Sequence, residues 1–118
     1  MKDVDRHALI ITPKPVFFAL LARISGDEFE VPDLAANDSR HVYLLPGGFV
    51  YHEEALEWLE TNRQVFFEEE LFRWYEDEEK FPQNISWSEF QDYFVFSVQS
   101  MITDTVPDEP IYYEDDPA

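Results

Sequence analysis

The sequence predicts an α+β fold in which a small antiparallel sheet packs against about three acidic amphipathic helices. The hydrophobic fraction of 45% and the aromatic fraction of 17% are high enough to form a core, since each buried aromatic ring removes roughly 150–250 Å² from water. Short β-type runs and a paired-glycine turn occupy the first half, whereas apolar residues at helical spacing dominate the second. The 118 residues match the length of one ordinary domain, so we expect a single domain over residues 1–118.

The N-terminal part of the chain combines a short β-type run with a helix. His7–Ile11 is the β-type run, and a helix start follows it, with Thr12 as a possible N-cap and Pro13 at the first helical position. The apolar residues after it predict a mostly buried helix that ends at Ser25-Gly26. A buried strand is the alternative, because the periodicity of a short apolar run does not separate the two.

A β-hairpin is predicted over residues 41–51, where two β-rich runs flank Pro46-Gly47-Gly48. The glycines of this turn can adopt positive φ, as tight hairpin turns require. Before the hairpin, Phe29–Val31 is a candidate short strand and Asp33–Arg40 is a polar loop.

Two acidic helical patterns follow the hairpin. Leu56 and Leu59 share one helical face with the aliphatic part of Arg63. Thr61-Asn62 is a plausible break, after which Gln64–Asp77 again has apolar residues at helical spacing. The pattern fits either one bent helix or two separate helices over this region.

A third acidic helix is predicted from a capping signal. Ser86 and Glu89 have the spacing of a capping box, in which each side chain satisfies a terminal backbone donor of the other residue. The helix that it opens carries an apolar stripe as far as Met101. Residues 105–118 form an acidic, proline-containing C-terminal segment, in which only Ile111–Tyr113 can dock, as an edge strand. We interpret the three tryptophans as core residues.

The acidic charge is concentrated in the second half of the chain. The whole sequence has 8 Lys plus Arg against 26 Asp plus Glu, a formal net charge of −18. Residues 1–51 carry a net −2 and residues 52–118 a net −16. Such a field repels nucleic acids and anionic membranes and attracts basic proteins or cations. Adaptation to high salt predicts acid enrichment throughout, so the asymmetry favours a binding face over a general solubility coat.

Several functional classes lack support in the sequence. Cysteine is absent, and His7, His41 and His52 have no metal-ligand spacing. There is no glycine-rich phosphate loop and no calcium-binding loop of the Asp-x-Asp-x-Asp-Gly type. No apolar run approaches the roughly 20 residues that span a bilayer, and the N-terminus has no secretory pattern. We therefore expect a non-enzymatic, cytoplasmic protein without cofactor, metal or membrane contact.

The acidic helical stretches predict a regular array of carboxylates. Side chains at positions i, i+4 and i+7 of a helix recur about every 4.5–6 Å along one face. This spacing is comparable to that of DNA phosphates, which follow one another at about 3.4 Å of axis per strand. A protein that binds the DNA backbone through Lys and Arg would meet a similar field here. The predicted partner-binding residues are Glu53, Glu57, Glu60, Glu68, Glu69, Glu70, Glu76, Asp77, Glu78 and Glu79.

In length, charge and aromatic content the chain resembles the DNA-mimic proteins, which are small acidic proteins of bacteria and phages. It is most similar to the mimic that binds HU, the histone-like nucleoid-associated protein. The resemblance covers the whole chain in composition but includes no motif, and these families share no common fold. It implies an inhibitor of a basic DNA-binding protein, HU-like or a nuclease, that acts as a monomer and does not itself bind nucleic acid. The alternative is an immunity protein that neutralises a nuclease toxin.

Overall fold

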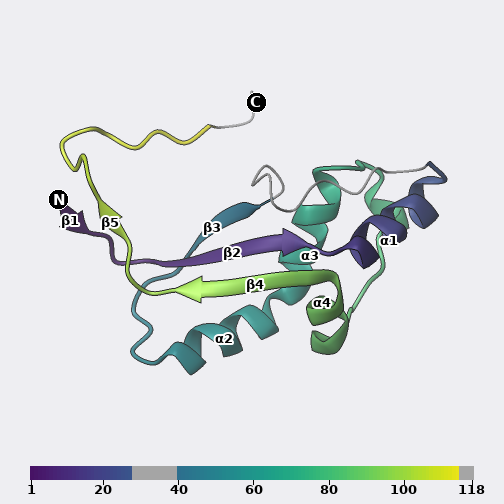
Figure 1. The fold of residues 1–118 in the computed structure, drawn as a ribbon, viewed down its shortest axis with the longest axis horizontal. Coiled ribbons are helices and arrows are strands. Elements are labelled where there is room, and N and C mark those ends of the chain that lie inside the picture. Colours follow the sequence, from purple (N-terminus) through teal and green to yellow (C-terminus); the bar gives the residue numbers. More distant parts are fainter. Residues whose placement is uncertain (28–39, 115–118) are drawn as a thin grey trace.

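The computed structural model describes residues 1–27 and 40–114, and it confirms the α+β class (Figure 1). In these two stretches four α-helices and one short 3₁₀ segment are combined with two antiparallel sheets. The elements are β1 (Lys2–Asp3), β2 (His7–Pro13), α1 (Pro15–Ser25), β3 (His41–Leu45), α2 (His52–Thr61), α3 (Arg63–Phe72), η2 (Glu78–Lys80), α4 (Trp87–Tyr93), β4 (Phe94–Gln99) and β5 (Thr103–Asp104).

The larger sheet has the strand order β3-β2-β4, with both neighbours antiparallel to the central strand β2. Leu9 and Ile11 of β2 are fully buried and belong to the same core cluster as residues of all four helices. Ile10 points to the opposite face of the sheet, as the period of two requires. Its partners in register, Val42 and Ser97, are exposed. The helices therefore cover one face of this sheet. The smaller sheet pairs β1 with β5.

The predicted hairpin over residues 41–51 is wrong in its second half. Its first run is strand β3, but this strand pairs with β2 over five residues rather than with residues 49–51. Phe49 instead packs edge-on against His7, with ring centroids 5.2 Å apart. Gly47 lies directly against the backbone of Asp5, where a Cβ atom would collide. The turn therefore packs against the segment that leads into β2. Strand β3 pairs with β2 because this apolar central strand offers five residues for pairing, whereas the run after the turn offers three.

Helix α1 confirms the predicted helix and its predicted end, while its start lies two residues later than predicted. Pro15, not Pro13, occupies the first helical position, and Lys14 is the N-cap. Thr12 and Pro13 remain in β2, where they pair with β4. Gly26 ends the helix with φ of 77°, in the left-handed region that glycine adopts without strain. The predicted strand 29–31 and most of the predicted loop 33–40 fall outside the described residues.

The acidic region after residue 52 forms two helices, α2 and α3, with Asn62 between them. Figure 1 shows that they run in different directions. The predicted break at Thr61-Asn62 is therefore confirmed. Helix α3 ends at Phe72 rather than at Asp77, and the amides of Trp74 and Tyr75 both donate to the carbonyl oxygen of Leu71. This turn leads into the short segment η2.

The capping box at Ser86 and Glu89 is confirmed by two 3.0 Å hydrogen bonds, one in each direction. The helix that follows ends at Tyr93, not at Met101, and the chain continues as strand β4. Phe94 and Val98 are buried in that strand. A spacing of four residues places side chains on one side of either a helix or a strand, so the stripe alone did not distinguish the two.

The C-terminal segment is not an edge strand in its described part. Ile111, Tyr112 and Tyr113 have no strand conformation and are 70%, 82% and 81% exposed. The pairing that this end of the chain does make lies earlier, between β5 and β1.

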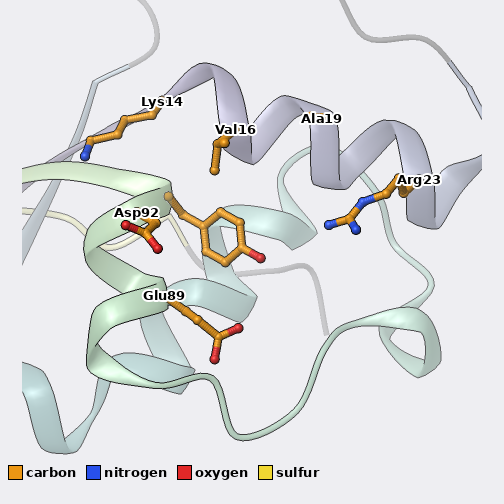
Figure 2. Close-up of a pocket in the computed structure, with 7 residues that line it drawn as sticks. Lys14, Val16, Ala19, Arg23, Glu89 and Asp92 are labelled. Carbon is orange, nitrogen blue, oxygen red and sulfur yellow. The ribbon is translucent and has the colours of Figure 1, made fainter.

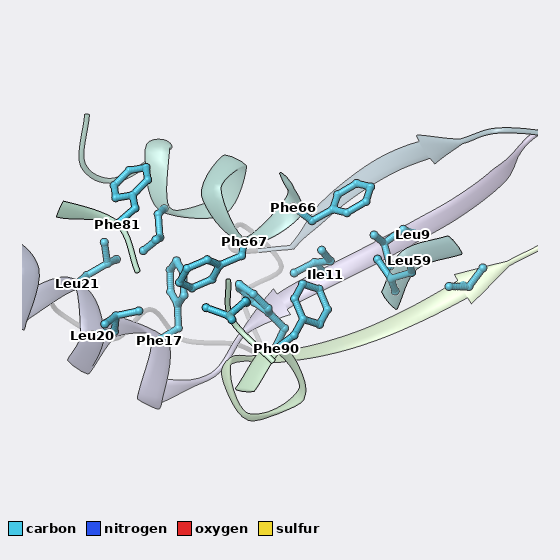
Figure 3. Packing of buried hydrophobic residues seen from close by; sticks show 14 of the residues in the cluster. Leu9, Ile11, Phe17, Leu20, Leu21, Leu59, Phe66, Phe67, Phe81 and Phe90 are labelled. Atoms are coloured by element: carbon cyan, nitrogen blue, oxygen red, sulfur yellow. The ribbon is translucent and has the colours of Figure 1, made fainter. Parts of the chain in front are cut away.

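The core joins the covered sheet face to the four helices (Figure 3). Phe17 of α1, Phe67 of α3, Phe90 of α4 and Leu59 of α2 are all fully buried. Phe94 of β4 contacts three of these helices through ring pairs with centroids 4.9–6.5 Å apart. These aromatic contacts hold α1, α3 and α4 in fixed positions along the sheet, and the burial of Ala55 and Leu59 attaches α2 to the same core.

Candidate functional site

The outer part of α2 carries a row of exposed carboxylates. Glu53, Glu57 and Glu60 are all exposed, and they flank Leu56 at positions i, i+3, i+4 and i+7 of one helical face. The opposite face of the helix is buried through Ala55 and Leu59. The burial of that face fixes the rotation of the helix, so the three carboxylates are held on a rigid element.

These carboxylates line one side of a groove of about 370 Å³ between α2 and the α4–β4 unit. Leu56, Trp87, Gln91 and Phe96 also line it. Trp87 and Gln91 are one helical turn apart on α4, and Phe96 is on β4. The groove therefore has an acidic wall and a largely aromatic wall, and no Lys or Arg lines it.

The aromatic wall is held in place by ring contacts. The indole of Trp87 stacks on Phe90 with centroids 5.4 Å apart and ring planes inclined by 10°. It also lies 5.4 Å from Phe96, which in turn lies 5.5 Å from Phe90. Since Phe90 is fully buried, the half-buried ring of Trp87 is anchored to the core.

The negative charge of this face is not neutralised within the described residues. No Lys or Arg nitrogen there lies within 4.0 Å of a carboxylate oxygen; the one ion pair joins His41 to Glu70. Arg63, the nearest cation in sequence, instead donates to the carbonyl oxygens of Ile85 at 2.6 Å and Glu60 at 2.7 Å. The α2 carboxylates thus present their full charge to solvent and to any partner.

Glu70 does not belong to the acidic surface, and its predicted place there is wrong. It is only 2% exposed, because α3 buries the face that carries Phe66, Phe67, Glu70 and Leu71. The Tyr43 hydroxyl donates to Glu70 Oε2 at 2.5 Å, and His41 Nδ1 lies 2.7 Å from the same oxygen. Burial and the neighbouring Glu70 carboxylate raise the pKa of Tyr43 far above its usual range.

The remaining predicted residues are not on the α2 face. Glu68 is half-buried, and its carboxylate accepts hydrogen bonds from Gln64 and Gln83 at 3.3 and 3.1 Å. Glu69 is exposed on α3, and the four acidic residues at 76–79 are exposed in the turn and the η2 segment. Phe81, just after η2, belongs to the same buried cluster as Leu21 of α1 (Figure 3). The ten residues therefore do not form one straight helical line. Of the ten, Glu53, Glu57 and Glu60 lie together on one exposed face of α2.

A second cleft, of about 510 Å³, lies between α1 and α4 (Figure 2). Lys14 and Arg23 approach it from the α1 side, and Glu89 and Asp92 from α4. Lys14 Nζ donates to the carbonyl oxygen of Gln91 at 2.8 Å, and Glu89 is engaged in the capping box. This mixture of charges gives no net preference for a basic partner, so the α2 groove is the stronger candidate.

Within residues 1–27 and 40–114, no three or more acidic or histidine side chains gather in a way that could hold a metal ion. No helix in that part of the chain is both long and apolar enough to cross a membrane. Comparison with protein-family models, curated proteins and solved structures finds no match. The case for a function therefore depends on the geometry and charge of the chain itself.

Proposed function

We propose that the protein is a non-enzymatic DNA mimic, which binds a basic DNA-binding protein and competes with DNA for it. A histone-like protein of the HU type is the favoured partner. The observation that carries this proposal is the row of exposed, uncompensated carboxylates of Glu53, Glu57 and Glu60 on a rigid helix face.

The spacing on α2 supports a resemblance to a phosphate backbone. Carboxylates three and four residues apart on a helix recur about every 4.5–6 Å along its axis, against about 3.4 Å per phosphate on one DNA strand. Lys and Arg side chains are long enough to bridge this difference. With a net charge of −18, the protein would steer a basic partner towards itself from a distance, and this attraction weakens as salt is added.

A mimic of this kind would act in the bacterial cytoplasm, where chromosomal DNA-binding proteins are found. It would act as a monomer and would not bind nucleic acid, because both carry the same sign of charge. The acidic residues at 69 and 76–79 would add to the long-range field, while α2 would make the close contacts.

Competition for DNA is the test of this function. Purified HU is mixed with a fluorescently labelled DNA duplex, and the acidic protein is added at low and at moderate salt. Fluorescence anisotropy is expected to fall to the value of free DNA, with a higher concentration required at moderate salt. If DNA stays bound at every ratio and both salt concentrations, HU is not the partner.

The groove beside α2 favours one alternative, an immunity protein that neutralises a nuclease toxin. Aromatic side chains in a pocket are typical anchors of tight protein–protein interfaces, and Trp87 and Phe96 occupy that position here. An immunity protein is expected to bind one nuclease with little sensitivity to salt, whereas a mimic is expected to lose affinity steeply as salt is raised.

A further inference from the structure

We propose that the groove between α2 and α4–β4 receives an arginine side chain of the basic partner. This inference rests on the proposed function and assigns the contact by which the partner would be recognised. An arginine side chain is cationic, planar at its guanidinium and apolar along its methylene groups. The acidic wall of the groove matches its charge, and the aromatic wall matches its planar and apolar parts.

The acidic wall determines the sign of the ligand charge. Glu53, Glu57 and Glu60 line the groove, and within the described residues no Lys or Arg pairs with them. An apolar or anionic ligand would leave these carboxylates unpaired or repelled, whereas a cation would gain charge-assisted hydrogen bonds.

The aromatic wall distinguishes arginine from lysine. A planar guanidinium stacks on an indole face and is more weakly hydrated than an ammonium group. Phe90 stacks on one face of the Trp87 ring, so the guanidinium would stack on the other face, and the contacts with Phe90 and Phe96 hold this ring among the residues that line the groove. The methylene groups of the same arginine would lie along Leu56.

The volume of the groove suits a side chain rather than a larger element. About 370 Å³ is near the lower end of ligand pockets, which range over roughly 300–1,000 Å³. Gln91, which lines the groove from α4, offers an amide oxygen as a further acceptor for a guanidinium donor. An arginine projecting from a partner strand or loop would thus meet acceptors on one side and an aromatic ring on the other.

The test uses two acetylated, amidated peptides of equal length and charge, one with alternating Gly-Arg and one with alternating Gly-Lys. Binding to wild type and to the Trp87→Leu variant is measured by isothermal titration calorimetry at moderate salt, and in wild type the NMR shift of the Trp87 indole N–H reports whether the peptide binds beside this ring. Arginine is expected to bind about fivefold more tightly than lysine, and the Trp87→Leu variant is expected to lose this preference. Equal affinities, or a preference that survives in Trp87→Leu, would overturn the inference.

A pair of charge variants keeps the test informative if Trp87→Leu does not fold. Glu57→Gln removes one carboxylate from the groove, and Glu79→Gln removes one from an exposed site outside it. Glu57→Gln is expected to weaken arginine-peptide binding at least threefold more than Glu79→Gln, and equal effects would contradict the groove as the site.

DNA displacement from HU without any arginine preference would overturn the groove alone. An arginine preference without DNA displacement from any basic DNA-binding protein would support the groove and overturn the mimicry.

Discussion

The buried hydrogen bond between Tyr43 and Glu70 gives the most quantitative prediction for the folded state. Replacing Tyr43 by Phe removes the hydroxyl that donates to Glu70 Oε2 at 2.5 Å and leaves the ring in place. Glu70 is 2% exposed, so water does not readily replace the lost donor, and His41 Nδ1 remains as the one partner of that oxygen among the described residues.

The expected cost is about 2 kcal/mol of unfolding free energy, because a hydrogen bond to a charged group contributes about 1.5–3 kcal/mol. The effect also depends on pH. Burial and the Glu70 carboxylate raise the pKa of Tyr43 in the folded state, so above pH about 10 the unfolded chain loses a proton that the folded protein keeps. The contribution of Tyr43 is therefore fully present below pH about 10 and falls by at most about 1.4 kcal/mol per pH unit above it.

Urea unfolding of wild type and Tyr43→Phe at pH 7, 9 and 11 tests this reasoning. The difference between them is expected to be about 2 kcal/mol at pH 7 and 9, and about 1.4 kcal/mol smaller at pH 11. Tyr93→Phe is the matched control, because the Tyr93 hydroxyl has no hydrogen-bond partner in the described part of the chain; it is expected to change stability by less than about 0.5 kcal/mol. A Tyr43→Phe difference that is the same at pH 9 and 11 would refute the raised pKa.

Two further predictions concern the helices of the site. Ser86→Ala removes the N-cap of α4 and is expected to lower the unfolding free energy by about 1 kcal/mol in urea titrations, whereas no effect would show that the cap does not position this helix. Glu57→Gln relieves like-charge repulsion with its neighbours on α2 and is expected to raise the unfolding free energy by about 0.2–0.5 kcal/mol. The same variant is expected to bind HU more weakly. A loss of stability, or binding equal to that of wild type, would contradict a role of the Glu57 carboxylate in binding the partner.

The sequence predicted elements with strong local signals and failed where distant contacts decide. The capping box at Ser86 and the glycine end of α1 depend on neighbouring residues, and both were correct. The hairpin was wrong because the partner of β3 is β2, and the paired residues lie thirty or more positions apart in the chain. The helix predicted to continue to Met101 is a strand from Phe94, because the open edge of β2 pairs with it.

The same limit applies to the site. The exposure of Glu53, Glu57 and Glu60 was predictable, because the apolar face of an amphipathic helix is buried and its charged face is left in solvent. Glu70 was assigned to the surface because it lies in a run of three glutamates, although it is three and four residues from Phe67 and Phe66 and so shares their buried face. Trp87 and Phe96 were not predicted as part of the site, since only the packing of α2 along β4 brings them beside the carboxylates.

The central claim is that the acidic face of α2 occupies the surface on which a partner binds DNA. It is tested most directly by measuring DNA release from HU with wild type and with the Glu53→Gln, Glu57→Gln, Glu60→Gln triple variant in parallel. Wild type is expected to release the duplex fully, and the triple variant to require at least tenfold more protein while remaining folded. Release by both proteins at the same concentration, or by neither, would contradict the assignment of this face.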